Sequence, residues 1–380
     1  MLSRLQVCEA KVKIMTCKEP VITICIPTFN RGDILLKNLN KYIGELSEKW
    51  PLLIIDNAST QTLAEYNKIS EIASNSQHIE YVRQAENTQV IGNLIKGFEL
   101  IDTTFVIFVS DEDLPKIQFL EENYDFLINN TDIGCIRTST ECQTEGIEKI
   151  NAWVFEENEF EPGIEAISNF SVNGNYLSGV IYNSKLLKSS GIINSLKMNR
   201  QSQIYYPHMY LSMKAAAKYR TIFTSKVSVC IGEPSAAEYD ENSNSISGYF
   251  GNYSFGSRLD QFISFRDSLL ECTKDFNDGK FDPTSFYIPY LNVVSKFMQM
   301  ITLSNYDQYL THGLSLNFLT QSFGKFALAA VKSFPMFEHI EASLADDINR
   351  IENEFLGRSA EICNPVLEIE YFKRNFMHYG

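Results

Sequence analysis

The sequence VITICIPTFNR spans residues 21–31 and decides the first element of the fold. Residues 21–29 are almost continuously apolar and rich in β-branched side chains, which is typical of a strand buried on both faces. Apolar residues at helical spacing follow over 34–46. This stretch therefore predicts a buried strand followed by an amphipathic helix.

The alternation of strand and helix continues as far as residue 139. Apolar runs predict strands at 51–56, 79–83, 105–109 and 133–139, and helical spacing predicts helices at about 62–75, at about 90–101 and from the polar turn at 110–113 to about 129. This pattern predicts an α/β fold with a mostly parallel central sheet that is covered on both faces.

Polar residues follow three of these strands where ligands bind to such sheets, beyond the carboxyl ends. The residues are Thr28, Asn30 and Arg31 after the first strand, Asp56 and Asn57 after the second, and Asp111, Glu112 and Asp113 after the fourth. Their shared position predicts a binding site at this edge of the sheet.

The pattern loosens after residue 139 and divides the rest of the chain. We expect a loop with a short helix at 140–175, strands at 176–182 and 221–231, and a helix at about 203–218. A long Gly, Ser, Asn and Tyr stretch then precedes helical periodicity. The expected division is a leader at 1–20, an α/β domain at 21–238, a loop or linker at 239–257 and an α-helical domain at 258–380.

The composition excludes several classes of protein. The 380 residues carry a formal net charge of −14, which disfavours broad contact with nucleic acid. The eight cysteines contain no Cys-x-x-Cys pair, so we expect reduced thiols. The sequence shows no 18-residue uncharged apolar run and no signal-peptide core. We therefore expect a cytoplasmic protein, with the inner face of the membrane as an alternative location.

The acidic cluster Ser110–Asp113 is the strongest chemical signal. Its three carboxylates repel one another unless a cation or basic group lies among them. Oxygen ligands of this kind suit Mg²⁺ or Mn²⁺ bound through one or two carboxylates and phosphate oxygens. The alternative is a solvated loop in which Asp111 or Asp113 caps the next helix. The sequence has no phosphate-binding P-loop, no Gly-x-Gly-x-x-Gly after the first strand and no Gly-x-Ser-x-Gly elbow.

Four motifs together resemble family 2 glycosyltransferases with the GT-A fold, of the bacterial surface-polysaccharide type. The motifs are IPTFNR at 26–31, IIDNAST at 54–60, ENTQVIGNLIKG at 86–97 and VSDED at 109–113, and the resemblance covers about residues 21–235. It implies a Rossmann-like domain that transfers sugar from a nucleotide-diphosphate donor, with inversion at the anomeric carbon.

The resemblance also implies which residues bind the nucleotide-sugar. Those that match the family motifs are Pro27, Thr28, Asn30, Arg31, Asp56, Asn57, Arg83, Asn87, Asn93, Asp111, Glu112 and Gly179. Asn57 replaces the second acid of the family's uracil-binding pair, and Gln89 stands at a position that is usually glycine. Arg83 could equally be a surface residue at a strand end, and Gly179 could serve only close packing.

The family's Asp-x-Asp motif, which binds metal and ribose, corresponds best to Asp111 and Asp113 with Mn²⁺ or Mg²⁺. A shifted register would use Ser110 and Glu112 instead. The resemblance places the catalytic base within residues 205–211 (YYPHMYL), at His208. Histidine can act as a general base at neutral pH. The alternatives are a structural His208 at a helix N-terminus and a base at Glu238 or Asp240.

The implied function is transfer from a UDP-sugar to a saccharide or lipid-linked saccharide of a bacterial capsule or O-antigen. The C-terminal helices are candidates for binding the acceptor, for homo-oligomer formation and for peripheral membrane association. A nucleotidyltransferase is disfavoured because the first strand lacks a Gly-rich basic loop. The remaining alternative is a non-catalytic nucleotide-sugar-binding or partner-binding protein of the same fold.

Overall fold

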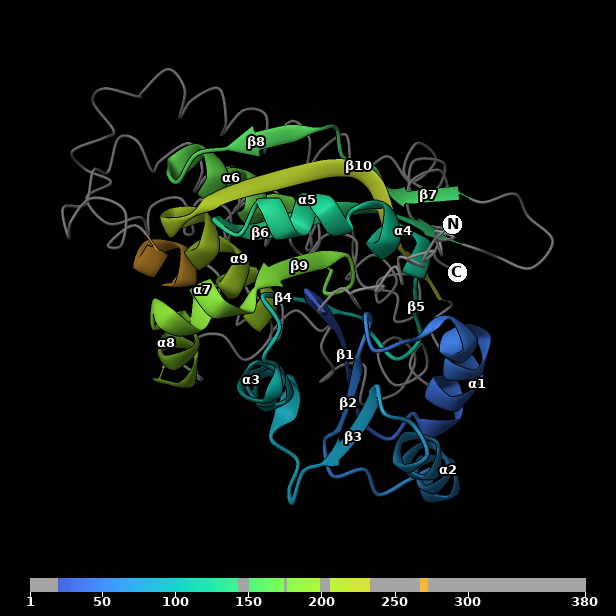
Figure 1. Ribbon diagram of the computed structural model, residues 1–380. Helices are drawn as coiled ribbons and strands as arrows, with labels where there is room; N and C mark the ends of the chain where they lie inside the picture. The colour runs from blue at the N-terminus through green and yellow to red at the C-terminus, as the bar shows by residue number, and fades with distance from the viewer. Residues whose placement is uncertain (1–19, 143–149, 174–175, 199–205, 233–266, 273–380) are drawn as a thin grey trace, which may run out of the picture.

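The structure, a computed structural model, describes residues 20–142, 150–173, 176–198, 206–232 and 267–272. Within them a single ten-stranded sheet runs in the order β3-β2-β1-β4-β9-β6-β10-β5, with β7 paired to β6 and β8 paired to β10. Helices cover both faces of this sheet (Figure 1).

The first half of the sheet is parallel and corresponds to the alternating apolar runs. Its strands are β1 (Ile22–Thr28), β2 (Leu52–Asp56), β3 (Ile79–Arg83) and β4 (Phe105–Phe108). Strand β1 pairs in parallel with β2 and β4, and β2 pairs in parallel with β3. Strands β2 and β4 are buried throughout, as their continuous apolar sequence predicts.

The second half of the sheet contains reversed strands. Strand β9 (Val180–Asn183) runs antiparallel between β4 and β6 (Ile133–Cys142), and β6 runs parallel to β10 (Arg220–Ile231). The short strands β5 (Leu114–Pro115), β7 (Ile150–Trp153) and β8 (Asn158–Phe160) pair antiparallel with β10 or β6. The strands that run in the same direction therefore all end at one edge of the sheet, where the reversed strand β9 starts. This edge is called the carboxyl edge below, and it holds the ends of β1, β2, β3, β4, β6 and β10.

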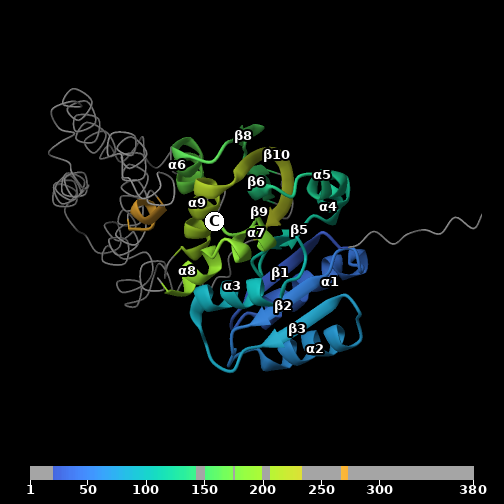
Figure 2. The same cartoon turned by 60° about the vertical axis from the view of Figure 1, so that its left-hand side comes forward.

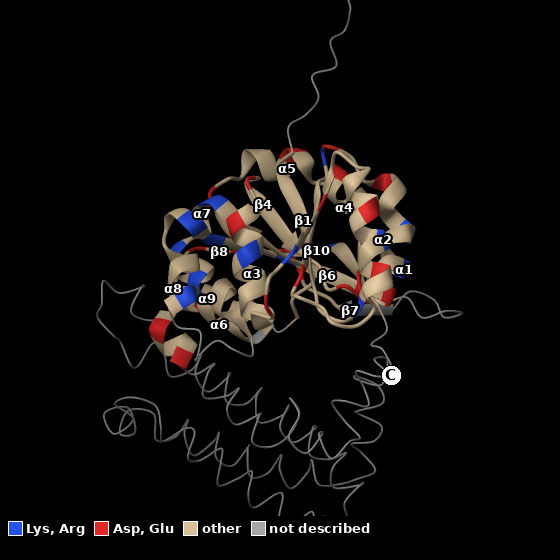
Figure 3. Ribbon diagram, turned by 90° about the horizontal axis from the view of Figure 1, so that it is seen from below, with Lys and Arg blue, Asp and Glu red and all other residues tan. Residues whose placement is uncertain are grey.

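The helices form two layers, one on each face of the sheet (Figure 2 and Figure 3). An apolar core lies between each layer and the sheet. One layer contains α3 (Gln89–Leu100), α6 (Ile164–Asn173), α7 (Ser184–Ser189), α8 (Ile192–Met198) and α9 (Pro207–Lys218). The other contains α1 (Gly32–Tyr42), the 3-10 turn η1 (Ile43–Glu45), α2 (Leu63–Ser74), α4 (Ile117–Glu122) and α5 (Tyr124–Asn129).

The structure confirms the predicted α/β class and its central sheet, and it corrects several boundaries. The helix expected to reach residue 129 is two helices that meet at Asn123, whose side-chain amide donates to the backbone oxygen of Phe119. The strand expected at 176–182 begins only at Val180, because Gly179 has a φ of +84°. The short helix expected within 140–175 is α6, and this segment also holds the unpredicted strands β7 and β8.

Most of the expected outer segments lie outside the described residues. These are the leader, the loop at 239–257 with the alternative bases Glu238 and Asp240, and all of the helical region except 267–272. That short helical segment packs on α9, where the Lys214 ammonium lies 3.0 Å from the Glu271 carboxylate. In the part of the chain that the structure describes, no helix combines the length and hydropathy needed to cross a membrane.

Candidate functional site

The acidic cluster forms a buried turn at the end of β4. The amide of Asp113 donates to the backbone oxygen of Ser110 at 3.0 Å, which closes the turn. The side chain of Asn38, on α1, donates to the backbone oxygens of Asp111 and Glu112 at 3.1 and 2.8 Å. Only 4% of Asp111 and 1% of Asp113 is exposed to solvent. Their carboxylates therefore need partners within the protein or in a ligand.

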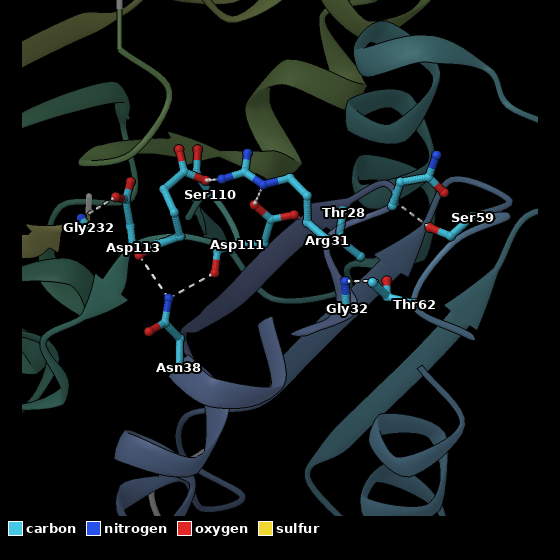
Figure 4. Close-up of polar contacts among 12 residues, drawn as sticks. Thr28, Arg31, Gly32, Asn38, Ser59, Thr62, Ser110, Asp111, Asp113 and Gly232 are labelled. Atoms are coloured by element: carbon cyan, nitrogen blue, oxygen red, sulfur yellow. Dashed lines mark hydrogen bonds and ion pairs between the residues drawn. The ribbon is translucent and has the colours of Figure 1, made fainter. Parts of the chain in front are cut away.

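Asp111 finds its partners at the end of β1 and on the loop that follows this strand (Figure 4). The hydroxyl of Thr28 donates to one carboxylate oxygen at 2.8 Å. The Arg31 guanidinium lies 3.3 Å from the other oxygen and also pairs with the Glu112 carboxylate at 3.0 Å. The structure thus brings Thr28 and Arg31 of the motif at 26–31 into contact with Asp111 and Glu112 of the motif at 109–113.

Burial and charge oppose each other in this cluster. Desolvation raises the pKa of the Asp111 carboxyl well above its usual range, and the neighbouring Arg31 cation counteracts part of that rise. Desolvation and the Glu112 carboxylate raise the pKa of Asp113 to about 7. Asp111 is therefore balanced by a basic group, whereas Asp113 sits in an environment that penalises its negative charge.

Asp113 accepts hydrogen bonds only from neutral donors among the contacts described. The Tyr176 hydroxyl donates to one oxygen at 2.7 Å and the Gly232 amide donates to the other at 2.8 Å. Neither donor carries a charge that would offset the buried carboxylate. Oxygen donors in such a setting fit a hard divalent cation.

The metal would not be held by protein side chains alone. In the described residues, no group of three or more His, Cys, Asp or Glu side chains could hold an ion. A cation at the acidic turn would therefore take most of its ligands from phosphate and water, and its presence there stays a prediction.

Asp56 lies at the end of β2 with no exposed surface and a full set of partners. One oxygen accepts from the Ser59 amide at 2.8 Å, and the other accepts from the Tyr81 hydroxyl and the Arg83 guanidinium, each at 2.8 Å. Arg83 also donates to the backbone oxygen of Ser59. Asp56 therefore fixes the loop after β2, and Arg83, whose side chain is 43% exposed, faces solvent at this edge.

Three asparagines connect the ends of the first three strands. The Asn57 amide donates to the Asn87 side chain at 2.9 Å, and the Asn57 carbonyl accepts from the Thr88 amide at 2.8 Å. Asn93, on α3, lies within 3.5 Å of the Thr28 backbone oxygen and within 3.4 Å of that of Ile55. Asn57 and Asn93 are buried. Their side chains therefore contribute to the candidate site by fixing the backbone of the neighbouring loops.

Backbone strain gathers in the same loops. Among the described residues, the non-glycine positions with positive φ are Asn30, Ala58, Thr62 and Gln89, all in the segments that follow β1, β2 and β3. Gln89 has a φ of +62°, the region that glycine adopts without cost. The Asn30 side chain accepts from the Thr60 and Gln61 amides at 2.7 and 3.1 Å, so in this structure it bridges two loops.

The remaining predicted residues lie on three other elements. Pro27 is in β1, paired with Ile55 of β2. Gly179 precedes β9, where a Cβ would come within 3.0 Å of Thr140 Cγ2 and 3.1 Å of Thr138 Oγ1. His208 lies in the first turn of α9, and its backbone oxygen accepts from the Tyr182 hydroxyl at 2.8 Å. These contacts anchor His208 to β9, and its role as the base stays a prediction.

Several residues of the candidate site were not predicted from the sequence, among them Asn38, Tyr81, Tyr176, Ser178 and Gly232. Two of them carried a signal. Asn38 interrupts the apolar stripe of α1, and a polar residue on such a stripe usually has a buried partner. Tyr81 stands two positions before Arg83 and so shares its strand face.

Gly232 allows a prediction, because its amide holds Asp113. A Cβ at Gly232 would lie 1.9 Å from the Glu112 backbone oxygen. We expect Gly232→Ala to destabilise the protein by about 1–3 kcal/mol and to lower the Tm by several degrees. The control is Gly44→Ala, where a Cβ meets nothing within 4 Å. Thermal unfolding of the two variants measures the difference, and equal Tm values would contradict the close approach.

Residues 23–190 of the chain match the model of glycosyl transferase family 2. No curated protein sequence matches the chain. Similar solved structures include residues 1–349 of TarS from S. aureus in complex with UDP-GlcNAc, with 14% identity, a TM-score of 0.46 and coverage of 85% of this chain and 91% of that one. Another is the mannosyltransferase PcManGT from Pyrobaculum calidifontis in complex with GDP-Man and Mn²⁺, with 13% identity, a TM-score of 0.46 and coverage of 91% and 87%.

Proposed function

We propose that this chain, a glycosyltransferase enzyme of family 2 through residues 23–190, moves a sugar from a UDP-linked donor to a saccharide acceptor. The observation that carries the proposal is the contact between the acidic turn and the loop after β1, through Thr28 and Arg31. This contact gathers carboxylates and a guanidinium at the edge where α/β sheets bind ligands.

The nucleoside half of the donor would lie over the ends of β1, β2 and β3. Pro27, Thr28 and Asn30 border it from β1, and Asp56 and Asn57 border it from β2. The exposed guanidinium of Arg83 is available there for hydrogen bonds to the base or the phosphates. Both carboxylate oxygens of Asp56 already accept hydrogen bonds within the protein. We therefore propose that the loop held by Asp56 selects the nucleotide base. Asn87, in the turn before α3, and Asn93, on α3, would contribute to this selection.

The diphosphate half would lie against the acidic turn. Asp113, with Asp111, would hold Mn²⁺ or Mg²⁺, and a bound divalent cation supplies positive charge for the departing diphosphate. Arg31 keeps Asp111 and Glu112 from repelling each other, and its partly exposed guanidinium can donate to phosphate oxygens. Glu112 is a candidate for the ribose hydroxyls.

The transfer itself is proposed as a single displacement with inversion. His208 would accept the proton of the acceptor hydroxyl while that oxygen forms a bond to the anomeric carbon. The bond from this carbon to the diphosphate breaks at the same time, and the electron pair leaves with the diphosphate. Gly179 would leave room for the donor sugar, since a side chain there would meet Thr138 and Thr140.

For the acceptor, we propose a saccharide or lipid-linked saccharide of a bacterial capsule or O-antigen, with the protein at the inner face of the membrane. The region 258–380 is proposed to bind this acceptor or a second copy of the chain. The proposed catalytic domain is 21–238, followed by a loop at 239–257.

The test is a UDP-release assay with a panel of UDP-sugars and oligosaccharide acceptors, before and after treatment with EDTA. We expect turnover with one UDP-sugar, loss of turnover on chelation and recovery with Mn²⁺ or Mg²⁺. NMR coupling constants of the product measure the anomeric configuration, and retention would contradict the proposed displacement. Turnover that survives chelation would contradict the role given to Asp113.

A further inference from the structure

Arg137 is a charged side chain in an unusual place. It lies in the middle of β6 with no exposed surface, on the sheet face covered by α9. Desolvation lowers the pKa of its guanidinium to about 10, so it still carries a charge at neutral pH. No carboxylate pairs with it in the part of the chain that the structure describes, and its Nε and Nη2 have no hydrogen-bond partner.

Burying a charge without an ionic partner lowers the stability of the folded state, because the charge loses its hydration. Replacing buried ionic groups by apolar ones of similar volume is often neutral or stabilising. A side chain that costs stability is a candidate for another role, so its contacts indicate what that role is.

The polar contacts of Arg137 converge on one segment, Tyr176–Gly179, which leads into β9. The Nη1 atom donates to the backbone oxygen of Ser178 at 2.8 Å and lies 3.3 Å from that of Tyr176. The next residue of β6, Thr138, donates its amide and its hydroxyl to the Gly179 oxygen at 2.9 and 3.0 Å. Two consecutive residues of β6 thus fix the backbone of this segment.

Aromatic rings add a second connection. The Arg137 guanidinium lies 5.3 Å from the ring centre of Phe155 and 6.0 Å from that of Trp153. Trp153 in turn stacks on Tyr176, with ring centres 4.8 Å apart and an angle of 26° between the planes. Arg137 therefore supports both the backbone and the ring of Tyr176.

The segment contacts the acidic turn on its other side. The Tyr176 hydroxyl donates to Asp113 at 2.7 Å, and the Ser178 hydroxyl accepts from the Ser110 amide at 2.9 Å. The first and last residues of the acidic turn are thus held by the segment that Arg137 holds.

We propose that Arg137 is a positioning residue, which acts through Tyr176 and Ser178 to set the geometry of the Ser110–Asp113 turn for the donor and its cation. The inference rests on the proposed function for its ligand, UDP with Mn²⁺. Arg137 touches neither of them. Its Nη1 atom reaches two backbone oxygens of the segment, and an apolar side chain cannot make these contacts.

The test compares Arg137→Met with a control that disturbs the same core. The control is Phe170→Leu, whose ring packs on Phe160 and Phe223 on this face of the sheet. Calorimetry measures the Kd for UDP with Mn²⁺, thermal unfolding gives the Tm, and mass spectrometry follows hydrogen exchange of the peptides that contain 110–113 and 176–179.

We expect Arg137→Met to raise the Kd by about 10–100-fold, the usual effect of removing a residue that orients a metal ligand. Exchange should speed up in both peptides, with little change in Tm. Phe170→Leu should lower the Tm and leave the Kd and those peptides unchanged. In a Tyr176→Phe background the effect of Arg137→Met on the Kd should shrink, because both changes break one chain of contacts.

Equal effects of Arg137→Met and Phe170→Leu on the Kd would overturn the proposal, as would unchanged exchange in the two peptides. If Arg137→Met fails to fold, Arg137→Lys provides the same comparison, because it keeps the charge and loses the planar guanidinium that reaches both backbone oxygens. A wild-type protein that does not bind UDP refutes the proposed donor. In that case the exchange experiment alone decides whether Arg137 positions the turn.

Discussion

Asp113→Asn is expected to lower kcat/KM for sugar transfer by about 10²–10³-fold, the range seen when one preorganised group that stabilises developing charge is removed. The substitution keeps the size of the side chain. The amide oxygen and nitrogen of asparagine take the places of the two carboxylate oxygens beside Tyr176 and Gly232. It removes the negative charge that a divalent cation would meet. Binding of UDP should lose its dependence on Mn²⁺ in the same variant.

The matched control for Asp113→Asn is Asp132→Asn. Asp132 precedes β6 at the opposite edge of the sheet, where its carboxylate lies 3.0 Å from the Arg220 guanidinium. This variant loses the same charge and should retain wild-type kinetics. Wild-type kcat/KM in Asp113→Asn, measured by UDP release with Mn²⁺, would contradict the assignment of Asp113 as a metal ligand.

His208→Gln is expected to lower kcat by about 10²–10⁴-fold, the usual contribution of a positioned general base. The donor does not need this group, so the Kd for UDP with Mn²⁺ should stay at the wild-type value. The contacts that hold His208 to Tyr182 and Ser212 use its backbone oxygen, and glutamine retains them. Single-turnover kinetics and calorimetry on the same preparation separate the two effects.

The control for this variant is His78→Gln, which changes a histidine in the turn before β3. It should have no effect on kcat. A His208→Gln protein with unchanged kcat would move the search for the base to Glu238 and Asp240. A parallel loss of UDP binding would indicate that His208 supports the donor site.

The first half of the fold was predictable because three of its four strands, β1, β2 and β4, are short apolar runs followed by polar residues. The runs at 21–29, 51–56, 79–83 and 105–109 correspond to β1–β4. Strands that are buried on both faces need such sequences, so the pattern is local and strong. The position of the site followed from the same pattern, because parallel strands bring their carboxyl ends together.

The second half was harder to predict because its strands depend on neighbours that are distant in sequence. Strands β7 and β8 are short and lie outside the main path of the sheet, where they pair with β6 and β10. Their sequences carry little alternation, so tertiary pairing decides them. The break between α4 and α5 at Asn123 involves a side chain that bonds back to its own helix, which helical spacing does not reveal.

Residue types predict which side chains take part in the candidate site, whereas the partners of each side chain required the structure. Arg31 is predicted to bind the nucleotide, and in the structure it pairs with Asp111 and Glu112, about eighty positions away. Asp56 was expected to face a base, and its oxygens are occupied by Ser59, Tyr81 and Arg83. Such pairings depend on how two loops meet, which no local pattern determines.

The most direct test of the account is calorimetric titration of the wild-type protein with UDP, with and without Mn²⁺. GDP, CMP and dTDP serve as comparison ligands under the same conditions. We predict that UDP binds, that Mn²⁺ tightens its binding and that the other nucleotides bind more weakly. Absence of UDP binding, or UDP binding that is indifferent to Mn²⁺, would contradict the proposed donor site at the carboxyl edge.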